Sequence, residues 1–179
     1  IAWTTDVNAA AYGELTYGAG KGKQSCIYLT IGTGVGGGGV VNGQLLQGFG
    51  RPEMGHIHVK RLEGDTFLGV CPYHGDCIEG LVAGPALEKR TGKKGQTLTE
   101  DDPVWQTQAY YIAQALMNYT LILSPEAIIL GGGVMQQEHL FPLIRQEFEK
   151  AVNGYVSYPE LNDYILPTGL GNNSGIIGC

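Results

Sequence analysis

Two runs of glycine stand directly after apolar, strand-like segments, and their placement constrains the fold of this chain more than any other feature. One run lies within residues 32–39, after segment 26–31, and the other is residues 131–133, after segment 127–130. The chain has 29 glycines in 179 residues, about twice the usual share. Glycine has no side chain to keep a ligand away from the backbone. The pattern therefore predicts an α/β sheet whose strand ends approach a ligand.

Composition and charge exclude several classes of protein. A chain of 179 residues can bury a core without disulfide staples. Its 17 Asp and Glu outnumber its 11 Lys and Arg, so the surface does not suit a nucleic-acid groove. No apolar stretch has the length needed to span a bilayer. We therefore expect neither a nucleic-acid partner nor a membrane partner.

The first residues and the cysteines indicate what kind of chain this is. The chain begins without an initiator Met and without a signal peptide, so we expect a fragment. Nothing indicates secretion, and we expect a cytoplasmic protein in which Cys and His more often bind metal than form disulfides. The four cysteines are Cys26, Cys71, Cys77 and Cys179.

The order of the local patterns predicts a mixed α/β domain with a central sheet and no internal repeat. Asn42-Gly43, between apolar residues, is a strong hairpin signal. The turn-like segment 171–175 normally starts a helix, and we expect that helix to be absent. We predict helices over residues 6–16, 78–90 with a break at 84–85, 103–123 and 142–151, and strands over 26–31, 40–41, 44–46, 56–60, 127–130 and 164–166.

Two familiar phosphate-loop motifs do not fit. Residues 20–22 lack the Ser or Thr that follows the Lys of a P-loop, and residues 32–37 lead into a strand where a dinucleotide fingerprint would open a helix. What remains is a glycine-rich hairpin with Thr33 at its tip, whose backbone N–H groups could contact phosphate. The alternative is a tight turn without a ligand. The second run, 131–133, favours a ligand-binding crevice.

Four side chains have the spacing of a metal site. His56, Cys71, His74 and Cys77 suit tetrahedral zinc in a closed structural site. The alternatives are a disulfide between the two cysteines and a chance grouping. His58 competes with His56, because strand alternation would place both histidines on one face.

Three carboxylates complete the candidate site. Glu53 precedes His56 by three residues and Glu79 follows Cys77 by two, so a bound metal would hold both in one neighbourhood. Together they are candidate acceptors for the hydroxyls of a polyol, although each alone could be a solvated surface residue. Asp6 is either a helix N-cap or a general base.

Five segments of the chain resemble the ROK sugar kinases, in the right order and over most of the length. Cys-Pro-Tyr-His-Gly-Asp-Cys at 71–77 is the most specific and is similar to the bacterial fructokinase branch, since most members begin this loop with Cys-x-Cys. The other segments are residues 4–14, 31–36, 52–56 and 131–135, and the fructokinase-like loop continues through residue 80.

The resemblance implies an actin-like ATPase (ribonuclease H-like) fold of two lobes. Residues 1–179 would be the carboxyl-terminal lobe with its mixed sheet, helices and zinc loop, without the amino-terminal lobe and the last helix. Asp6 aligns with the catalytic base of the family. The aligned sugar-contacting residues are Thr5, Glu53, His56 and Glu79, and Thr5 stands where many members have Asn.

The glycine runs align with the nucleotide-binding motifs of the family. The resemblance implies that Thr33 and Gly34 contact phosphate and that Gly131, Gly132 and Gly133 contact adenosine. The implied reaction is phosphorylation of D-fructose to fructose 6-phosphate, with ATP, Mg²⁺ and a structural Zn²⁺ in a cytoplasmic homodimer. Glucose or mannose kinase is the nearest alternative, and a sugar-sensing repressor or a purely structural zinc module are others. We expect the isolated chain to be inactive.

Overall fold

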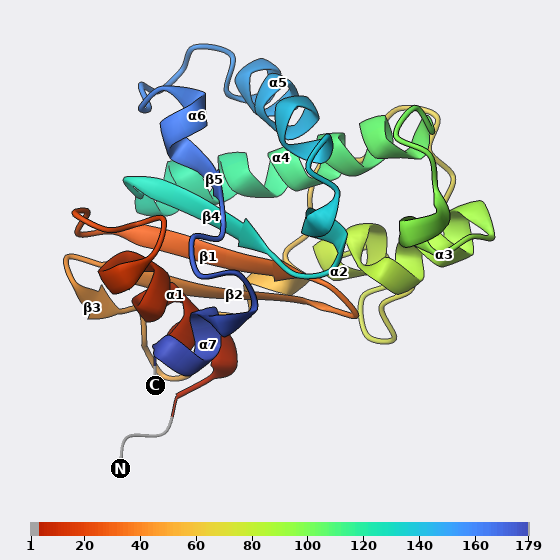
Figure 1. The fold of residues 1–179 in the computed structure, drawn as a ribbon. Helices are drawn as coiled ribbons and strands as arrows, with labels where there is room; N and C mark the ends of the chain where they lie inside the picture. The colour runs from red at the N-terminus through yellow and green to blue at the C-terminus, as the bar shows by residue number, and fades with distance from the viewer. Residues whose placement is uncertain (1–3, 179) are drawn as a thin grey trace.

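The computed structural model describes residues 4–178, so Cys179 lies outside the described residues. Its centre is one five-stranded sheet with the order β3-β2-β1-β4-β5 (Figure 1). Strands β1 and β2 are antiparallel, as are β2 and β3, whereas β1 and β4 are parallel, as are β4 and β5. The strands are β1 Cys26–Ile31, β2 Val35–Val41, β3 Gln44–Leu45, β4 Ala127–Gly131 and β5 Ile165–Pro167.

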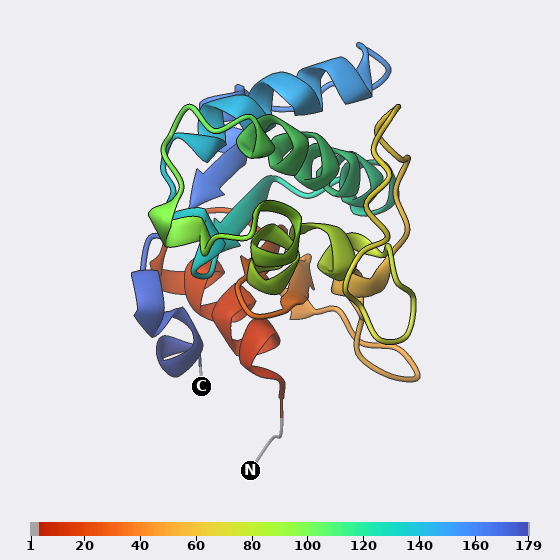
Figure 2. The same ribbon diagram turned by 90° about the vertical axis from the view of Figure 1, so that its right-hand side faces the viewer.

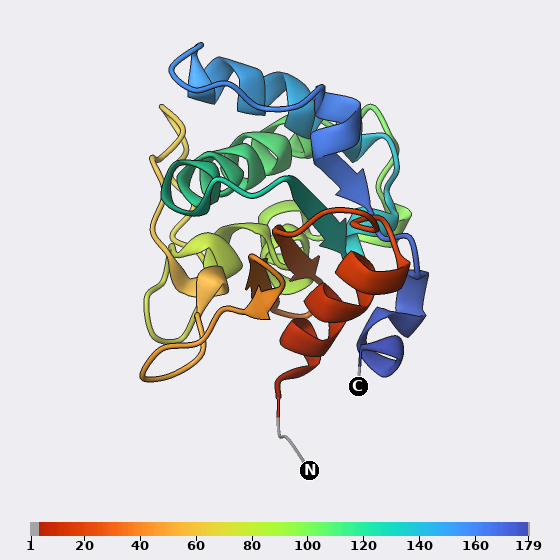
Figure 3. The same cartoon turned by 90° about the vertical axis from the view of Figure 1, so that its left-hand side faces the viewer.

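Helices cover both faces of the sheet. Helices α1 and α7 lie side by side on one face, and α4 and α5 cover the other (Figures 1 and 3). The helices are α1 Asp6–Tyr17, α2 Ile78–Val82, α3 Gly84–Thr91, α4 Val104–Leu123, α5 Leu140–Val152, α6 Leu161–Tyr164 and α7 Ser174–Ile177, and the 3₁₀ turns are η1 Met54–His56, η2 Gly95–Thr97, η3 Val134–Gln136 and η4 Gly171–Asn173.

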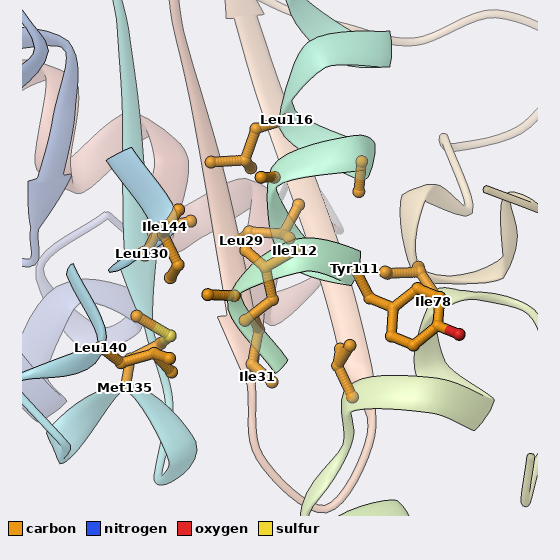
Figure 4. Close-up of a cluster of buried hydrophobic side chains, with 14 of the residues drawn as sticks. Leu29, Ile31, Ile78, Tyr111, Ile112, Leu116, Leu130, Met135, Leu140 and Ile144 are labelled. Carbon is orange, nitrogen blue, oxygen red and sulfur yellow. The ribbon is translucent and has the colours of Figure 1, made fainter. Parts of the chain in front are cut away.

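Alternation along β1 divides the core between the two faces. Ile27, Leu29 and Ile31 are buried toward α4 and α5, whereas Cys26 and Tyr28 are buried toward α1. Figure 4 shows Leu29 and Ile31 packed among side chains from α2, α4, β4, η3 and α5. The sheet is therefore a two-sided platform that can hold its strand ends in fixed positions.

The register brings the two glycine runs to the same edge of the sheet. Ile31 pairs with Val35 in β2, which leaves residues 32–34 as the turn of the hairpin. Thr30 pairs with Gly131 in the parallel neighbour β4. The predicted hairpin, the predicted strand before residue 131 and the predicted turn at Asn42-Gly43 are all confirmed.

The predicted strand over residues 56–60 is wrong. His56 ends η1, and residues 57–60 belong to no strand. The Ile57 carbonyl accepts a hydrogen bond from the Ile78 N–H, where α2 begins. Ile57 and Val59 pack partly buried against the core, so the apolar alternation reflects packing rather than strand pairing. Figure 2 shows these irregular segments along one side of the molecule.

The other helix expectations mostly hold. The break expected at residues 84–85 is confirmed, because α2 ends at Val82 and α3 begins at Gly84. A short helix, α7, begins at Ser174 within segment 171–175, and the absence of the last helix stays a prediction. The Ser174 hydroxyl stabilises the start of α7, because it donates a hydrogen bond to a carboxylate oxygen of Glu14 at 2.7 Å.

Candidate functional site

A cavity of about 370 Å³ joins the residues that the sequence singled out for chemistry. It lies between the amino-terminal end of α1, the β1–β2 turn, the segment before η1, and α2. All but one of the candidate catalytic, sugar and phosphate residues line it together, although they come from four parts of the chain. These are Thr5, Asp6, Thr33, Gly34, Glu53 and Glu79.

Asp6 is the first residue of α1 and is exposed at the cavity. Thr5, not Asp6, is the N-cap, because its hydroxyl accepts a hydrogen bond from the Asn8 N–H at 3.2 Å. Asp6 Oδ1 accepts a hydrogen bond from the adjacent Val7 N–H at 2.9 Å. Of the two alternatives for Asp6, the helix N-cap is therefore wrong, and the general base stays a prediction.

Glu79 connects the cavity to the glycine-rich hairpin. It lies in the first turn of α2, and its Oε2 accepts a hydrogen bond from the Val35 N–H at 3.0 Å. A Cβ added at Gly34 would lie 2.7 Å from this oxygen, so the turn and the carboxylate are in close contact. The carboxylate therefore supports the turn at the point where β2 begins.

Glu53 reaches the cavity from the start of η1. It is the N-cap of this turn, its side chain is exposed, and its carbonyl accepts a hydrogen bond from the His56 N–H at 3.0 Å. One short turn therefore holds a candidate sugar contact at one end and a candidate metal ligand at the other. His56 does not line the cavity, and its contact with a sugar stays a prediction.

The four predicted metal ligands converge into one cluster that could hold a metal ion. The ligand atoms of His56, Cys71, His74 and Cys77 all lie within 4.8 Å of one another. His56 Nδ1 is 3.5 Å from Cys77 Sγ and 3.8 Å from Cys71 Sγ. Both cysteines are free thiols. The competing residue His58 is not in the cluster and instead lies 3.5 Å from an oxygen of Asp76.

The two thiols of the cluster differ in their tendency to ionise. Desolvation opposes ionisation of Cys71, but the N–H groups of His74 and Tyr73 outweigh it and lower the pKa of the Cys71 thiol. Burial and the neighbouring Cys71 raise the pKa of the Cys77 thiol to about 11. Two adjacent thiolates repel each other, so a cation between them would favour the form in which both are ionised.

A second cavity, of about 460 Å³, adjoins the first at the strand ends. Gly32 and Thr33 line both cavities, and Gly133 lines the second. Gly131 and Gly132 instead line a third cavity of about 850 Å³. Gly132 has a φ of +91°, and a Cβ there would lie 2.5 Å from the Ile31 carbonyl oxygen. The second glycine run thus lies between two cavities.

Several lining residues gave no signal in the sequence. Lys94 and Trp105 line the second cavity, and Thr30 and Arg51 line the first. Trp105 lies in a helical pattern that reads as core, and isolated Lys, Thr and Arg residues carry no motif. Only the packing of α3, α4 and the sheet assigns them to cavities.

Asp65 anchors the irregular segment between η1 and Cys71, the next of the four predicted metal ligands. Its carboxylate accepts hydrogen bonds from Arg90 at 2.7 Å and from the Tyr111 hydroxyl at 2.5 Å. Arg61 lies 3.8 Å from Asp65 and 3.3 Å from Asp76, the residue before Cys77. These contacts tie the loop that carries the metal ligands to α3 and α4.

None of the helices in residues 4–178 is both long and apolar enough to cross a membrane.

Known proteins are similar to this chain over nearly its whole length. A sequence profile described as the ROK family matches residues 1–179. A fructokinase of Pediococcus pentosaceus is 54% identical over 176 residues, which cover 98% of this chain and 61% of that protein. The chain therefore spans less than two thirds of the length of this relative.

Solved structures share its fold. A ROK hexokinase from Thermus thermophilus superimposes with a TM-score of 0.83 at 28% identity, over 98% of this chain and 62% of that one. A ROK family glucokinase from Streptomyces griseus, in complex with glucose and AMPPNP, gives a TM-score of 0.77 at 29% identity, over 97% and 65%. The expected actin-like fold class is confirmed, and the chain belongs to the ROK family.

Proposed function

We propose that the protein containing this chain is an ATP-dependent fructokinase. The observation that carries the proposal is the single cavity in which Asp6, two further carboxylates and the glycine-rich turn meet. The similarity to a fructokinase of Pediococcus pentosaceus supports fructose as the sugar. The similarity to a glucokinase in complex with glucose and AMPPNP supports a hexose and a nucleoside triphosphate as the reactants.

The proposed reaction is an in-line transfer of the γ-phosphoryl group to the 6-hydroxyl of fructose. A new P–O bond forms to the sugar oxygen, the bond to the β-phosphate oxygen breaks, and ADP leaves. Asp6 accepts the proton of the attacking hydroxyl, and its exposed side chain at the cavity is accessible for this. Mg²⁺ bound to ATP would offset the charge on the phosphates.

We assign the remaining predicted residues to sugar and nucleotide. Glu53 and Glu79 accept hydrogen bonds from sugar hydroxyls, with Thr5 and His56 as further contacts. The turn at Thr33 and Gly34 binds phosphate through backbone N–H groups. Gly131, Gly132 and Gly133 approach the adenosine, whose base would enter the second cavity beside the last of these glycines.

We propose zinc as the metal of the four-residue cluster. Two thiols and two imidazoles are a donor set that zinc prefers, and its tetrahedral ligands lie about 3.3–3.8 Å apart. Three of the ligand pairs have separations of 3.5 to 3.8 Å, which supports this choice. A bound zinc would supply a structural link between η1 and the segment before α2, with no part in phosphoryl transfer.

The experiment is a phosphorylation assay of the complete protein with ATP and fructose, glucose or mannose. We expect the highest kcat/KM with fructose, with fructose 6-phosphate as the product. A preference for glucose or mannose would assign the protein to the alternative sugar kinases. Turnover of no hexose, together with specific DNA binding, would contradict the proposal and favour a sugar-sensing repressor.

We also propose that the protein is cytoplasmic and forms a homodimer. Two free thiols in one cluster support a reducing compartment such as the cytoplasm. A homodimer rests on the family resemblance, and the molar mass of the complete protein in solution would test it.

A further inference from the structure

We infer that Tyr119 is a positioning residue for the sugar site, acting through the backbone of η1. This inference rests on the proposed function, because it assigns the effect to the sugar-facing Glu53. Tyr119 lies near the end of α4, and its hydroxyl donates a hydrogen bond to the Met54 carbonyl oxygen at 2.6 Å. Met54 directly follows Glu53 in the chain.

The hydrogen bond between Tyr119 and Met54 is buried at both ends. Tyr119 is 4% exposed and Met54 is 6% exposed. Burial raises the pKa of the Tyr119 hydroxyl, so it remains a neutral donor. A buried carbonyl that loses its donor keeps the full cost of its desolvation. Without this hydroxyl, the Met54 peptide would move toward water or another donor.

The opposite side of η1 is packed tightly against β2. A Cβ added at Gly55 would lie 1.8 Å from the Val35 carbonyl oxygen, and the Met54 side chain packs against Gly37. The turn therefore has no room to shift toward the sheet. On its other side, the hydrogen bond from Tyr119 in α4 fixes its position. Any movement of the Met54 peptide would change the direction of Glu53.

His56 makes the same argument testable without catalysis. It ends η1, and its Nδ1 points at the thiols of Cys71 and Cys77. Loosening the turn should therefore also loosen a metal ligand. The hydrogen bond of Tyr119 can therefore be tested in two independent ways, through sugar binding at the Glu53 end of η1 and through metal release at the His56 end.

Tyr164, the last residue of α6, provides a matched control, because its hydroxyl bonds to α4, the helix that carries Tyr119. Its hydroxyl shares a hydrogen bond of 2.9 Å with Thr120 Oγ1, the residue after Tyr119. Tyr164 is 1% exposed, so Tyr164→Phe deletes the same atom from an equally buried site. The Tyr164 hydrogen bond does not involve η1.

The experiment compares Tyr119→Phe with Tyr164→Phe. In the complete protein, we expect Tyr119→Phe to raise KM for fructose about 3- to 10-fold, with KM for ATP unchanged. In the zinc-loaded complete protein, it should speed transfer of zinc to a chromogenic chelator by a similar factor. Tyr164→Phe should lower the melting temperature comparably and leave KM for fructose and zinc release unchanged.

The outcomes separate this inference from the proposed function. If both variants match the wild type in KM for fructose and in zinc release, or if both change them equally, the positioning role is wrong while the kinase assignment stands. If the wild type phosphorylates no hexose, the proposed function fails. In that case, faster zinc release from Tyr119→Phe but not from Tyr164→Phe would still show that Tyr119 positions η1. The proposed effect of Tyr119 on a sugar contact would be wrong, because there would be no sugar site.

Discussion

The three carboxylates at the first cavity are held in different ways. Glu79 accepts a hydrogen bond from the backbone of β2, and Glu53 is positioned through the turn that follows it. Asp6 accepts a hydrogen bond only one residue away along its own helix. A proton acceptor needs a free oxygen within reach of its substrate, and Asp6 fits that role better than Glu79.

Asp6→Asn is the direct test of that role. In the complete protein, we expect kcat to fall by roughly 10²- to 10⁴-fold, because the amide has nearly the same size but cannot accept the proton. Sugar binding should change little. The measurement is kcat with fructose, and Asp163→Asn, an exposed carboxylate in α6, is the control. Near wild-type turnover by Asp6→Asn would place the base elsewhere.

The pKa of the Asp65 carboxyl makes the stability of the fold depend on pH. Burial alone would raise the pKa of its carboxyl, but hydrogen bonds from Arg90, Tyr111 and the Phe67 N–H outweigh burial and lower the pKa to about 2. A lowered pKa contributes stability that is present above the unfolded pKa, near 4. That stability is lost as the pH falls from about 4 toward 2.

Asp65→Asn should therefore lower the free energy of unfolding at pH 7 by roughly 2 kcal/mol. The difference from the wild type should shrink as the pH approaches 2, because the wild-type carboxyl then becomes protonated as well. Urea unfolding at pH 7 and at pH 3 measures both effects. A difference that is equal at both pH values would show that the ion pair with Arg90 does not carry the stability.

The turn η1 packs closely against β2 of the sheet. Gly55 lets the turn lie directly on β2, where the Val35 carbonyl occupies the space that a Cβ would need. This contact sets the distance between the Glu53 end of the turn and the glycine-rich hairpin.

Gly55→Ala should lower the free energy of unfolding by about 1–3 kcal/mol, since the backbone atom in contact cannot move aside as a side chain could. Gly48→Ala is a suitable control, because a Cβ there meets nothing within 4 Å. Urea denaturation of both variants is the measurement. Equal stability of the two variants would mean that η1 can move away from the sheet at little cost.

The metal cluster connects η1 with the amino-terminal end of α2, where Cys77 is the N-cap. We predict one zinc per chain, measured by elemental analysis. Removal with a chelator should increase amide hydrogen exchange in residues 71–82 and leave exchange in α5 unchanged, because binding and folding of such a site are coupled. A chain that holds no zinc, or that forms a disulfide between Cys71 and Cys77, would contradict this prediction.

At the scale of the whole molecule, the candidate site is exposed. Asp6, Thr33 and Glu53 are all exposed in the described residues, and the chain spans 61% of the length of a similar fructokinase. Phosphoryl transfer requires both reactants to be held in a site that excludes water. We propose that these residues form one wall of a cleft, and one wall alone does not meet that requirement.

We therefore expect the 179-residue chain alone to phosphorylate no hexose. The measurement is ADP release with fructose and ATP at high enzyme concentration, with the complete protein as the positive control. Fructose-dependent ADP release from the isolated chain would show that these residues suffice for the site.

Much of the fold follows from local signals in the sequence. The break between α2 and α3 was predictable from Gly84-Pro85, and the β2–β3 turn from Asn42-Gly43. Segment 56–60 was not, because apolar alternation has the same appearance in a strand and in a loop packed on a core. The Ile57 carbonyl bonds to α2 rather than to a strand, and only the three-dimensional arrangement shows that choice.

The sequence by itself predicted three of the four candidate metal ligands, Cys71, His74 and Cys77, and the glycine-rich hairpin, because their chemistry depends on residue type and short spacing. His56 was separated from His58 only by the tertiary structure, which points one imidazole at the thiols and the other at Asp76. The same holds for the hydrogen bonds of Glu79 to Val35 and of Tyr119 to Met54. Such partners lie 44 and 65 residues apart, and strand register and helix packing, which no local pattern encodes, bring them together.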